Sequence, residues 1–212
     1  MKRFSLLIFI LFLTTAIQAQ WGSAAIKLGY FNPKATEGGF IIGYEGGSYI
    51  DENFNYGWSI DWFHRKYVDK SYVAEINQVP GGPSGSINEL RATTNVHDLP
   101  VMLNITAAIN VAPRFKIFFT GAAGVDVLLV FYRNYENPDN DEFQGAFDFG
   151  WRLGGGVAFE LGSRSDLFLE CSYNGSKPSW TYEVEIAGVK RTFEREHDMS
   201  GILLRAGFRF FY

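Results

Sequence analysis

Apolar and polar residues alternate along most of this chain, and this alternation predicts β-strands. In the run from Ser200 to Tyr212, the even-numbered positions from Ile202 onward are apolar, whereas Arg205 and Arg209 fall between them. A period of two places neighbouring side chains on opposite faces of a strand. In a soluble sheet the apolar face would be buried, but in a transmembrane barrel it faces lipid and the arginines face the lumen.

Eight runs of the chain have this pattern. They cover residues 23–31, 39–50, 55–68, 96–109, 115–132, 147–161, 166–175 and 200–212. Residues 180–186 alternate in the same way and could extend the seventh run. Pro100 interrupts the fourth run. Because proline within a sheet usually marks an edge or a bulge, we expect a local irregularity there or a strand that begins after it. In the fifth run the alternation becomes unclear at Leu128 and Val130, which are both apolar.

The connections between these runs are short and long in turn. The short ones are residues 51–53, 110–114 and 162–165, and the others, usually longer, are residues 32–38, 69–95, 133–146 and 187–196. Short turns at one rim and long loops at the other are typical of an outer-membrane barrel with both termini on the periplasmic side. The predicted fold class is therefore all-β, an eight-stranded antiparallel up-and-down transmembrane β-barrel. Residues 80–85, Pro-Gly-Gly-Pro-Ser-Gly, cannot continue a strand and predict an exposed flexible loop or a binding loop.

The first residues predict a cleaved signal peptide. Lys2 and Arg3 precede an apolar run over residues 5–13, and the small residues Ala16 and Ala19 follow. A membrane-spanning helix would need roughly 20 apolar residues, more than this run provides. We therefore expect a signal peptide over residues 1–19 and a single barrel domain over residues 20–212. No later stretch of sequence suits a spanning helix, so insertion would require strands that close into a barrel.

Composition and charge narrow the class further. Aromatic residues make up 17% of the chain and glycine occurs 23 times, which suits strands and tight turns. The net charge of −4 provides no basic face for phosphates, so we expect no nucleic-acid partner. The single cysteine, Cys171, excludes an internal disulfide and is most simply a packed or lipid-facing thiol.

The polar faces of the runs collect charged residues of both signs. We expect them to form a charge network in the lumen: Lys27, Glu45, Asp61, Asp98, Lys116, Asp126, Asp148, Arg152, Glu160, Glu170, Arg205 and Arg209. Side chains just fill an eight-stranded barrel, and a buried charge left without a partner costs about 3 to 5 kcal/mol. The sequence therefore favours a closed, salt-bridged interior, and a narrow ion path lined by the same residues is the alternative. Glycines on this face are expected to make room for the arginines: Gly43, Gly124, Gly150, Gly154 and Gly156.

These features together resemble a known family. The signal-peptide pattern, the eight amphipathic runs, the aromatic last residue and the segment Asp98-Leu99-Pro100-Val101-Met102-Leu103 resemble the β-barrel domain of small porin-family outer-membrane proteins, especially those of Bacteroidota. The chain is similar in scale to OmpA-like and OmpX-like barrels. The resemblance covers nearly the whole mature chain but rests on patterns. It implies insertion by the barrel assembly machinery, which reads the final strand, and functions in adhesion, envelope stability or secretion.

No motif predicts catalysis, a metal site or a cofactor. The three histidines, His64, His97 and His197, lack the spacing of metal ligands or of a partner cysteine. His197, Asp198 and Ser200 are too close along one strand to face a common site. We therefore expect no enzymatic activity and no cofactor.

Three functions agree with the sequence. The first is a closed outer-membrane barrel with a structural, interaction or adhesion role, whose loops meet an extracellular ligand or an envelope protein. The second is a passive narrow channel for small solutes. The third is a secreted soluble barrel with an apolar ligand inside, which would require apolar residues in the lumen. The expected partners of the first two are outer-membrane lipid and, during insertion, the assembly machinery.

Overall fold

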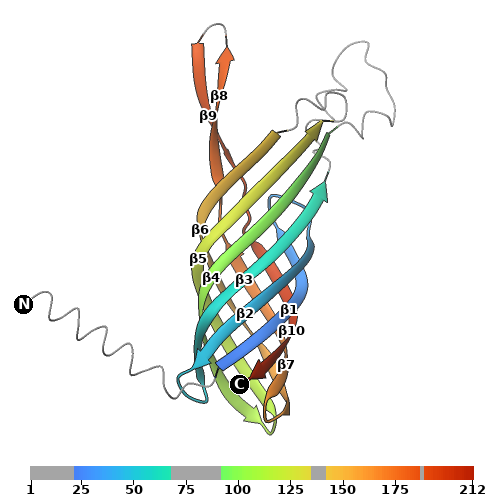
Figure 1. Cartoon of the computed structure of the whole chain (residues 1–212), viewed down its shortest axis with the longest axis vertical. Coiled ribbons are helices and arrows are strands. Elements are labelled where there is room, and N and C mark those ends of the chain that lie inside the picture. Colours follow the sequence, from blue (N-terminus) through green and yellow to red (C-terminus); the bar gives the residue numbers. More distant parts are fainter. Residues whose placement is uncertain (1–21, 68–91, 135–141, 187–188) are drawn as a thin grey trace, which may run out of the picture.

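Eight strands close into an antiparallel barrel in the order β1-β10-β7-β6-β5-β4-β3-β2 (Figure 1). The computed structural model describes residues 22–67, 92–134, 142–186 and 189–212, so the expected signal peptide lies outside the described residues. The strands of the barrel are β1 (Gly22–Pro33), β2 (Gly39–Tyr49), β3 (Phe54–Tyr67), β4 (Ala92–Ala112), β5 (Phe115–Asn134), β6 (Glu142–Gly162), β7 (Ser165–Gly175) and β10 (Gly201–Phe211). The predicted fold class is confirmed.

A separate two-stranded hairpin lies between β7 and β10 in the chain. It consists of β8 (Ser179–Ile186) and β9 (Val189–Glu196), and it extends beyond the upper end of the barrel in Figure 1. The prediction that residues 187–196 form a loop was wrong, because residues 189–196 pair with β8. The alternation at 180–186 was a genuine strand signal, but it belongs to this hairpin and not to an extension of the barrel wall.

Pro100 lies within β4, and the strand continues through it. In the ladder to β5, Pro100 is the Cα partner of Asp126 without any change of register. In the ladder to β3, pairing stops after Ile60 and Val101 and resumes at Phe63 and Asp98 in the same register. The expected irregularity is therefore an interruption of one ladder, as follows from the missing N–H of proline. The other differences are longer strands: β4 begins at residue 92 and β6 at residue 142. Residues 68–91 and 135–141 lie outside the described part of the loops.

The two rims of the barrel differ. Tight turns at residues 50–53, 113–114 and 163–164 lie at the lower rim, where the two ends of the barrel also meet. Gly22 and Tyr212 exchange two backbone hydrogen bonds there, both 2.9 Å long. The carboxylate of Asp51 accepts the N–H groups of Asn53 and Phe54 at 2.7 and 2.8 Å and so fixes the first turn. The upper rim carries the hairpin and the described ends of the strands that the longer connections join.

The outer wall of the barrel is apolar. Phe147, Phe149 and Leu153 on β6 are 74%, 65% and 61% exposed, and the same outward face continues on the other strands. Between them on β6, Arg152 points inward and is 2% exposed. This arrangement is the reverse of a soluble protein and matches a wall in contact with hydrocarbon. Among the residues that the structure describes, no helix is long and apolar enough to cross a bilayer.

Apolar side chains also close the interior toward both ends, which the sequence analysis did not predict. The upper cluster contains Phe31, Ile41, Phe63, Val96, Leu128, Val130, Ala146, Met199 and Leu203. The lower cluster contains Ala25, Phe118, Ala158 and Phe168. The alternation is unclear at Leu128 and Val130 because both faces of β5 are apolar at this level. One face points outward, and the other, with Leu128 and Val130, packs in the upper cluster.

An arginine on the outer wall tests this assignment. Phe149→Arg or Leu153→Arg should lower the free energy of unfolding by about 2 to 4 kcal/mol, because the charge would lie near the middle of the bilayer. Urea unfolding in lipid vesicles measures the change. Leu161→Arg is the matched control, since Leu161 is exposed on the same strand but lies one residue before its lower end, where the cost should be about 0 to 1 kcal/mol. Equal effects at residues 149 and 161 would contradict the assignment of the wall.

Candidate functional site

The charged side chains that alternate with the apolar wall all lie on inward-facing positions. Most of the expected set is buried: Lys27, Glu45, Asp61, Asp98, Asp126, Arg152, Glu170, Arg205 and Arg209. Lys116, Asp148 and Glu160 are half-buried nearer the ends of their strands. The structure therefore brings these residues into one lumen, but it divides them into groups with different partners.

The central group is a continuous chain of ion pairs across the barrel. Asp61 on β3 accepts hydrogen bonds from Arg152 Nη1 on β6 at 2.5 Å and from Arg205 Nη1 on β10 at 3.1 Å. The other terminal nitrogen of Arg205 donates to Glu170 on β7 at 2.5 Å. Asp61 thus joins strands that are far apart in the sequence and on different sides of the lumen.

Lys27 extends this chain to the neighbouring strands. Its ammonium forms an ion pair with Glu45 on β2 and lies 3.6 Å from the carboxylate of Glu170. All the side chains of the central group are 5% exposed or less. Ion pairs removed from water gain strength but require complete pairing, so the group holds its strands at fixed positions.

Two small residues make space for this group. A Cβ atom at Gly43 would collide with the carboxylate of Asp61, and one at Gly29 would collide with the backbone carbonyl of Leu204 and lie 2.8 Å from both Cα and Cγ of Arg205. The five glycines were expected to make room for arginines, and this was wrong: Gly43 makes room for Asp61, and no arginine atom is among the nearest neighbours of the other four. Gly124 lies against the backbone of Val101 and Met102, and Gly150 lies against the Met102 side chain. Gly154 lies against Ser172, and Gly156 lies against Phe118 and the backbone of Leu169. The barrel interior is therefore packed closely around uncharged side chains as well.

Arg209 forms a lower branch of the network. Its guanidinium lies 3.5 Å from Glu45 and 3.8 Å from Asp166, donates to the Tyr49 hydroxyl at 3.4 Å, and sits 4.7 Å above the ring of Phe168. Sequence reasoning missed Asp166 and Tyr49. Asp166 could have been found, because it lies four residues before Glu170 on the same face of β7. Tyr49 could not, since the alternation of β2 is lost after Glu45.

Three aspartates above the central group have no cationic partner in the described part of the chain. Asp126 accepts a hydrogen bond from Ser176 Oγ, and Asp148 accepts the backbone N–H of Lys177 at 2.5 Å. Asp98 is 0% exposed, and neither of its carboxylate oxygens has a hydrogen-bond partner among the described residues. The prediction that opposite charges meet throughout the lumen therefore does not hold for this group.

The segments that join the hairpin to the barrel cover the upper opening. We call residues 176–178 and 197–200 the hairpin base. Ser176, Met199 and Ser200 are buried, with Met199 in the upper apolar cluster. Asn174 Nδ2 donates to the Met199 carbonyl at 3.4 Å, and Ser200 Oγ donates to the Ser176 carbonyl at 3.3 Å. Asp126 and Asp148 thus bind the hairpin base over the mouth of the barrel.

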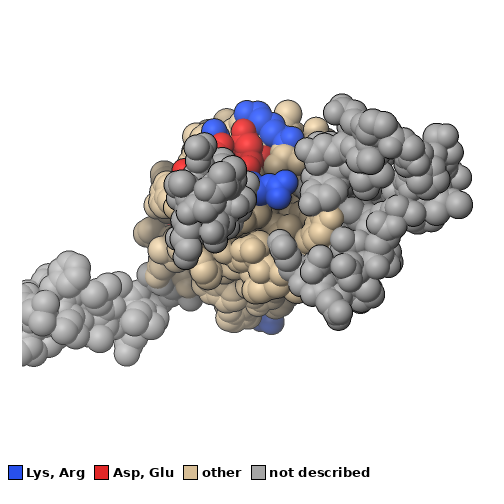
Figure 2. Space-filling model, turned by 90° about the horizontal axis from the view of Figure 1, so that it is seen from above, with Lys and Arg blue, Asp and Glu red and all other residues tan. Residues whose placement is uncertain are grey.

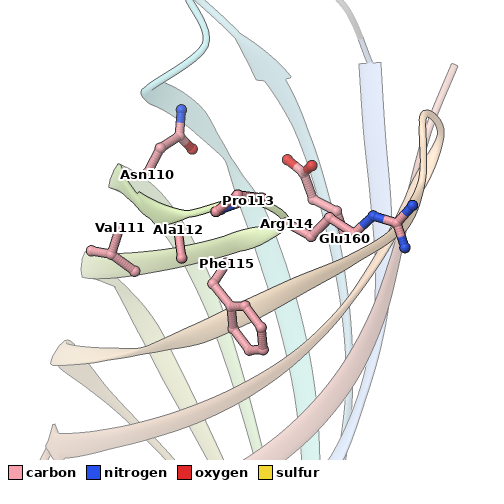
Figure 3. A pocket seen from close by; sticks show the side chains of 7 residues that line it. All are labelled: Asn110, Val111, Ala112, Pro113, Arg114, Phe115 and Glu160. Carbon is pink, nitrogen blue, oxygen red and sulfur yellow. The ribbon is translucent and has the colours of Figure 1, made fainter.

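Two depressions of the described residues lie at the lower rim, and neither gathers a set of catalytic or ligand-binding groups. One is an open hollow of about 440 Å³ at the turn between β4 and β5, bordered by Arg114 and Glu160. Figure 3 shows its side chains spread around the turn, with Val111 and Phe115 directed away from Glu160. The other, beside Lys116, Asp166 and Arg209, measures about 20 Å³, which is room for about one water molecule. Lys116 pairs with Glu160 at 2.7 Å at this rim.

The upper face carries exposed charges of both signs, seen from above in Figure 2 beside the tan barrel wall. Arg65 pairs with Glu37 at 2.6 Å, and Lys177 pairs with Glu196 at 3.1 Å. No group of three histidine, cysteine or carboxylate side chains in the described ranges is arranged to hold a metal ion. His64 and His97 lie together on the outer wall, while His197 stacks on Trp180 at 4.8 Å.

Comparisons with known proteins agree on the fold. No protein-family model and no curated protein matches the chain. Among solved structures, it is similar to a major outer membrane protein from Thermus thermophilus, with a TM-score of 0.64 and 13% identity over 92% of this chain and 100% of that one. It is also similar to Neisserial surface protein A, with a TM-score of 0.53 and 10% identity over 90% and 96% of the two chains. The outer membrane protein OprG from Pseudomonas aeruginosa gives 0.53 and 11% over 91% and 97%.

At these identities the likeness is one of fold. The closed barrel and its apolar outer wall define a small integral outer-membrane β-barrel protein. The third function, a secreted soluble barrel with an apolar ligand inside, is excluded. It would need a lumen that is free for the ligand, whereas paired charges fill the centre here.

Removing the central carboxylate should destabilise the barrel. In Asp61→Ala, Arg152 loses its ion-pair partner while it stays buried, and we expect a loss of about 3 to 5 kcal/mol. Urea unfolding in vesicles, followed by tryptophan fluorescence, measures it. The control is Glu160→Ala, which breaks the half-exposed pair with Lys116 and should cost no more than about 1 kcal/mol. Similar losses for both variants would show that the central group does not hold the fold.

The substitution Asp98→Asn should instead raise the free energy of unfolding. The amide keeps the shape of the carboxylate and removes a buried negative charge that has no cationic partner among the described residues, so we expect stability to rise by about 1 to 3 kcal/mol. The same unfolding measurement applies. Asp166→Asn is the comparison, because its carboxylate lies 3.8 Å from Arg209 and the loss of this charge should not stabilise the barrel. A marked destabilisation by Asp98→Asn would mean that Asp98 has a favourable role in the lumen.

Proposed function

We propose that this protein is a closed outer-membrane barrel with a structural or interaction role, and that it presents its upper rim to an extracellular ligand or to another envelope protein. The filled lumen supports this proposal above all. Apolar clusters lie above and below a central group of ion pairs, and the hairpin base covers the upper opening. A barrel filled in this way acts through its surface and its stability, and we propose no catalytic role for it.

We propose that the lower rim, with both ends of the barrel, faces the periplasm. The short turns and the paired ends at Gly22 and Tyr212 support this orientation, because short periplasmic turns and longer extracellular loops are typical of such barrels. The hairpin would then stand outside the cell. In the same proposal, the assembly machinery recognises β10, the strand that closes the barrel against β1.

The hairpin is suited to an interaction because its foundation is rigid. Its base is bonded to β5 and β6 through Asp126 and Asp148, and Lys177 pairs with Glu196 at 3.1 Å where the two strands begin to separate from the barrel. Loops on rigid scaffolds are common places for binding. We also propose a resemblance to the barrels of Bacteroidota, which is supported by the signal-peptide pattern, the eight amphipathic runs, the aromatic last residue and the segment 98–103.

A passive narrow channel remains the second candidate, since it would use the same lumen residues. The cavity beside Lys116, Asp166 and Arg209 at the lower rim is a feature in its favour. The tightly paired Asp61, Arg152 and Arg205 above it speak against an open path. Conduction would require these side chains to separate.

Electrical recording distinguishes the two candidates. The refolded protein should give no single-channel steps in a planar lipid bilayer, because its lumen is filled by side chains. Insertion must be checked in parallel by the change in electrophoretic mobility on heating, which folded barrels show. The variant Arg152→Ala with Phe63→Ala, which removes bulk from both the central group and the upper cluster, serves as the control for detection. Regular steps from the unmodified, inserted protein would support the channel and overturn the closed barrel.

A further inference from the structure

Two histidines form a pair on the outer wall of the barrel. His64 on β3 and His97 on β4 are cross-strand partners, and their ring centroids lie 4.5 Å apart. Both rings stack with Trp62, at 6.2 and 6.1 Å, and His97 also meets the ring of Phe131 edge-on at 5.6 Å. The imidazoles thus lie among aromatic rings on the outer wall.

The protonation state of this pair is linked to a hydrogen bond. Trp62 Nε1 donates to His97 Nδ1 at 3.2 Å, so this nitrogen is an acceptor and carries no proton. When His97 gains a proton, both ring nitrogens become donors and the bond from Trp62 is lost. The indole N–H and the imidazolium N–H groups would then all need acceptors in the same place.

The pair lies where the outer face of β3 and β4 changes from apolar to polar. Toward the lower rim, the next outward residues are Trp62 and Leu99, followed by Ile60 and Val101, and the apolar series continues beyond them. Toward the upper rim, the next outward residues are Lys66, which is exposed, and Asn95, its cross-strand partner. Aromatic and basic residues at such a transition are typical of the boundary between hydrocarbon and lipid headgroups.

Within the described ranges, no acidic side chain faces outward beside these bases. The outward positions of β2, β3, β4 and β5, as far as the structure describes them, contain no aspartate or glutamate. Glu37, in the connection before β2, has its carboxylate bonded to Arg65 at 2.6 Å. The surface around His64, His97 and Lys66 therefore attracts anions, and an anion at this depth in a membrane belongs to a lipid.

We propose that His64, His97, Lys66 and Trp62 form a binding site for the phosphate group of an anionic membrane lipid. The phosphate accepts hydrogen bonds from the imidazolium groups and the indole N–H, Lys66 supplies a further positive charge, and the acyl chains lie along the apolar wall below. Binding strengthens when the imidazoles are protonated, because each ring then adds a positive charge and a second N–H donor. The site goes beyond the proposed surface role, and it operates whether or not the hairpin has a partner.

Histidine-selective NMR tests the site residue by residue. The chain has three histidines, and His197 lies outside the site, so it serves as an internal control. The full barrel is placed in phosphatidylcholine nanodiscs with or without phosphatidic acid and titrated with acid. Phosphatidic acid should raise the titration midpoints of His64 and His97 by about 0.5 to 1 pH unit and leave that of His197 nearly unchanged. Unchanged midpoints for His64 and His97, or equal shifts for all three residues, would overturn the proposal.

Two further experiments distinguish a specific binding site from a general effect of surface charge. Lys66→Gln should reduce the shifts by about half, whereas Lys34→Gln, which removes the same charge from the upper rim, should not change them. Inorganic phosphate added to discs without anionic lipid should leave the midpoints in place. If it reproduces the shifts, the group binds free phosphate and the lipid assignment is wrong. The mobility change on heating confirms that each variant is folded.

Discussion

The pairing of buried charge around Asp61 is the interaction on which the rest of this barrel depends. Arg152 and Arg205 come from strands on other sides of the lumen, and both end at this one carboxylate. Closure of the sheet determines which strands are neighbours. The packing of side chains in the lumen determines how closely the strands surround the barrel axis. Because each of these groups would be costly alone in the interior, their mutual contacts favour a single arrangement of the wall.

The layers above and below this centre have different tasks. The apolar clusters keep water from the ion pairs and so maintain their strength. Among the described residues, the aspartates above the centre do not pair with cations, and Asp126 and Asp148 bind the hairpin base. The lumen is therefore both the core of the protein and the anchor of its exposed part, which is why we favour a role at the surface over transport.

Much of this architecture could be predicted from alternation alone. A period of two specified the inward positions of Arg152, Glu170 and Arg205, because each lies between outward apolar neighbours. It could not specify partners, since contacts such as Asp61 with Arg205 depend on the shear of the closed barrel. It also failed where both faces have the same character, as at Leu128, and where a strand leaves the wall, as at residues 189–196. The histidine pair could not be predicted either, because alternation does not specify partners and residues 64 and 97 meet only through the register of β3 and β4.

The attachment of the hairpin has a mechanical consequence. Its two strands continue directly into β7 and β10, yet Ser176 and Lys177 are also tied to β5 and β6. A pulling force on the hairpin tip would therefore be distributed over four strands of the barrel, β5, β6, β7 and β10, and would not separate a single pair of neighbouring strands. This attachment suits a protruding hairpin that must resist lateral force while the strands of the barrel below it stay paired.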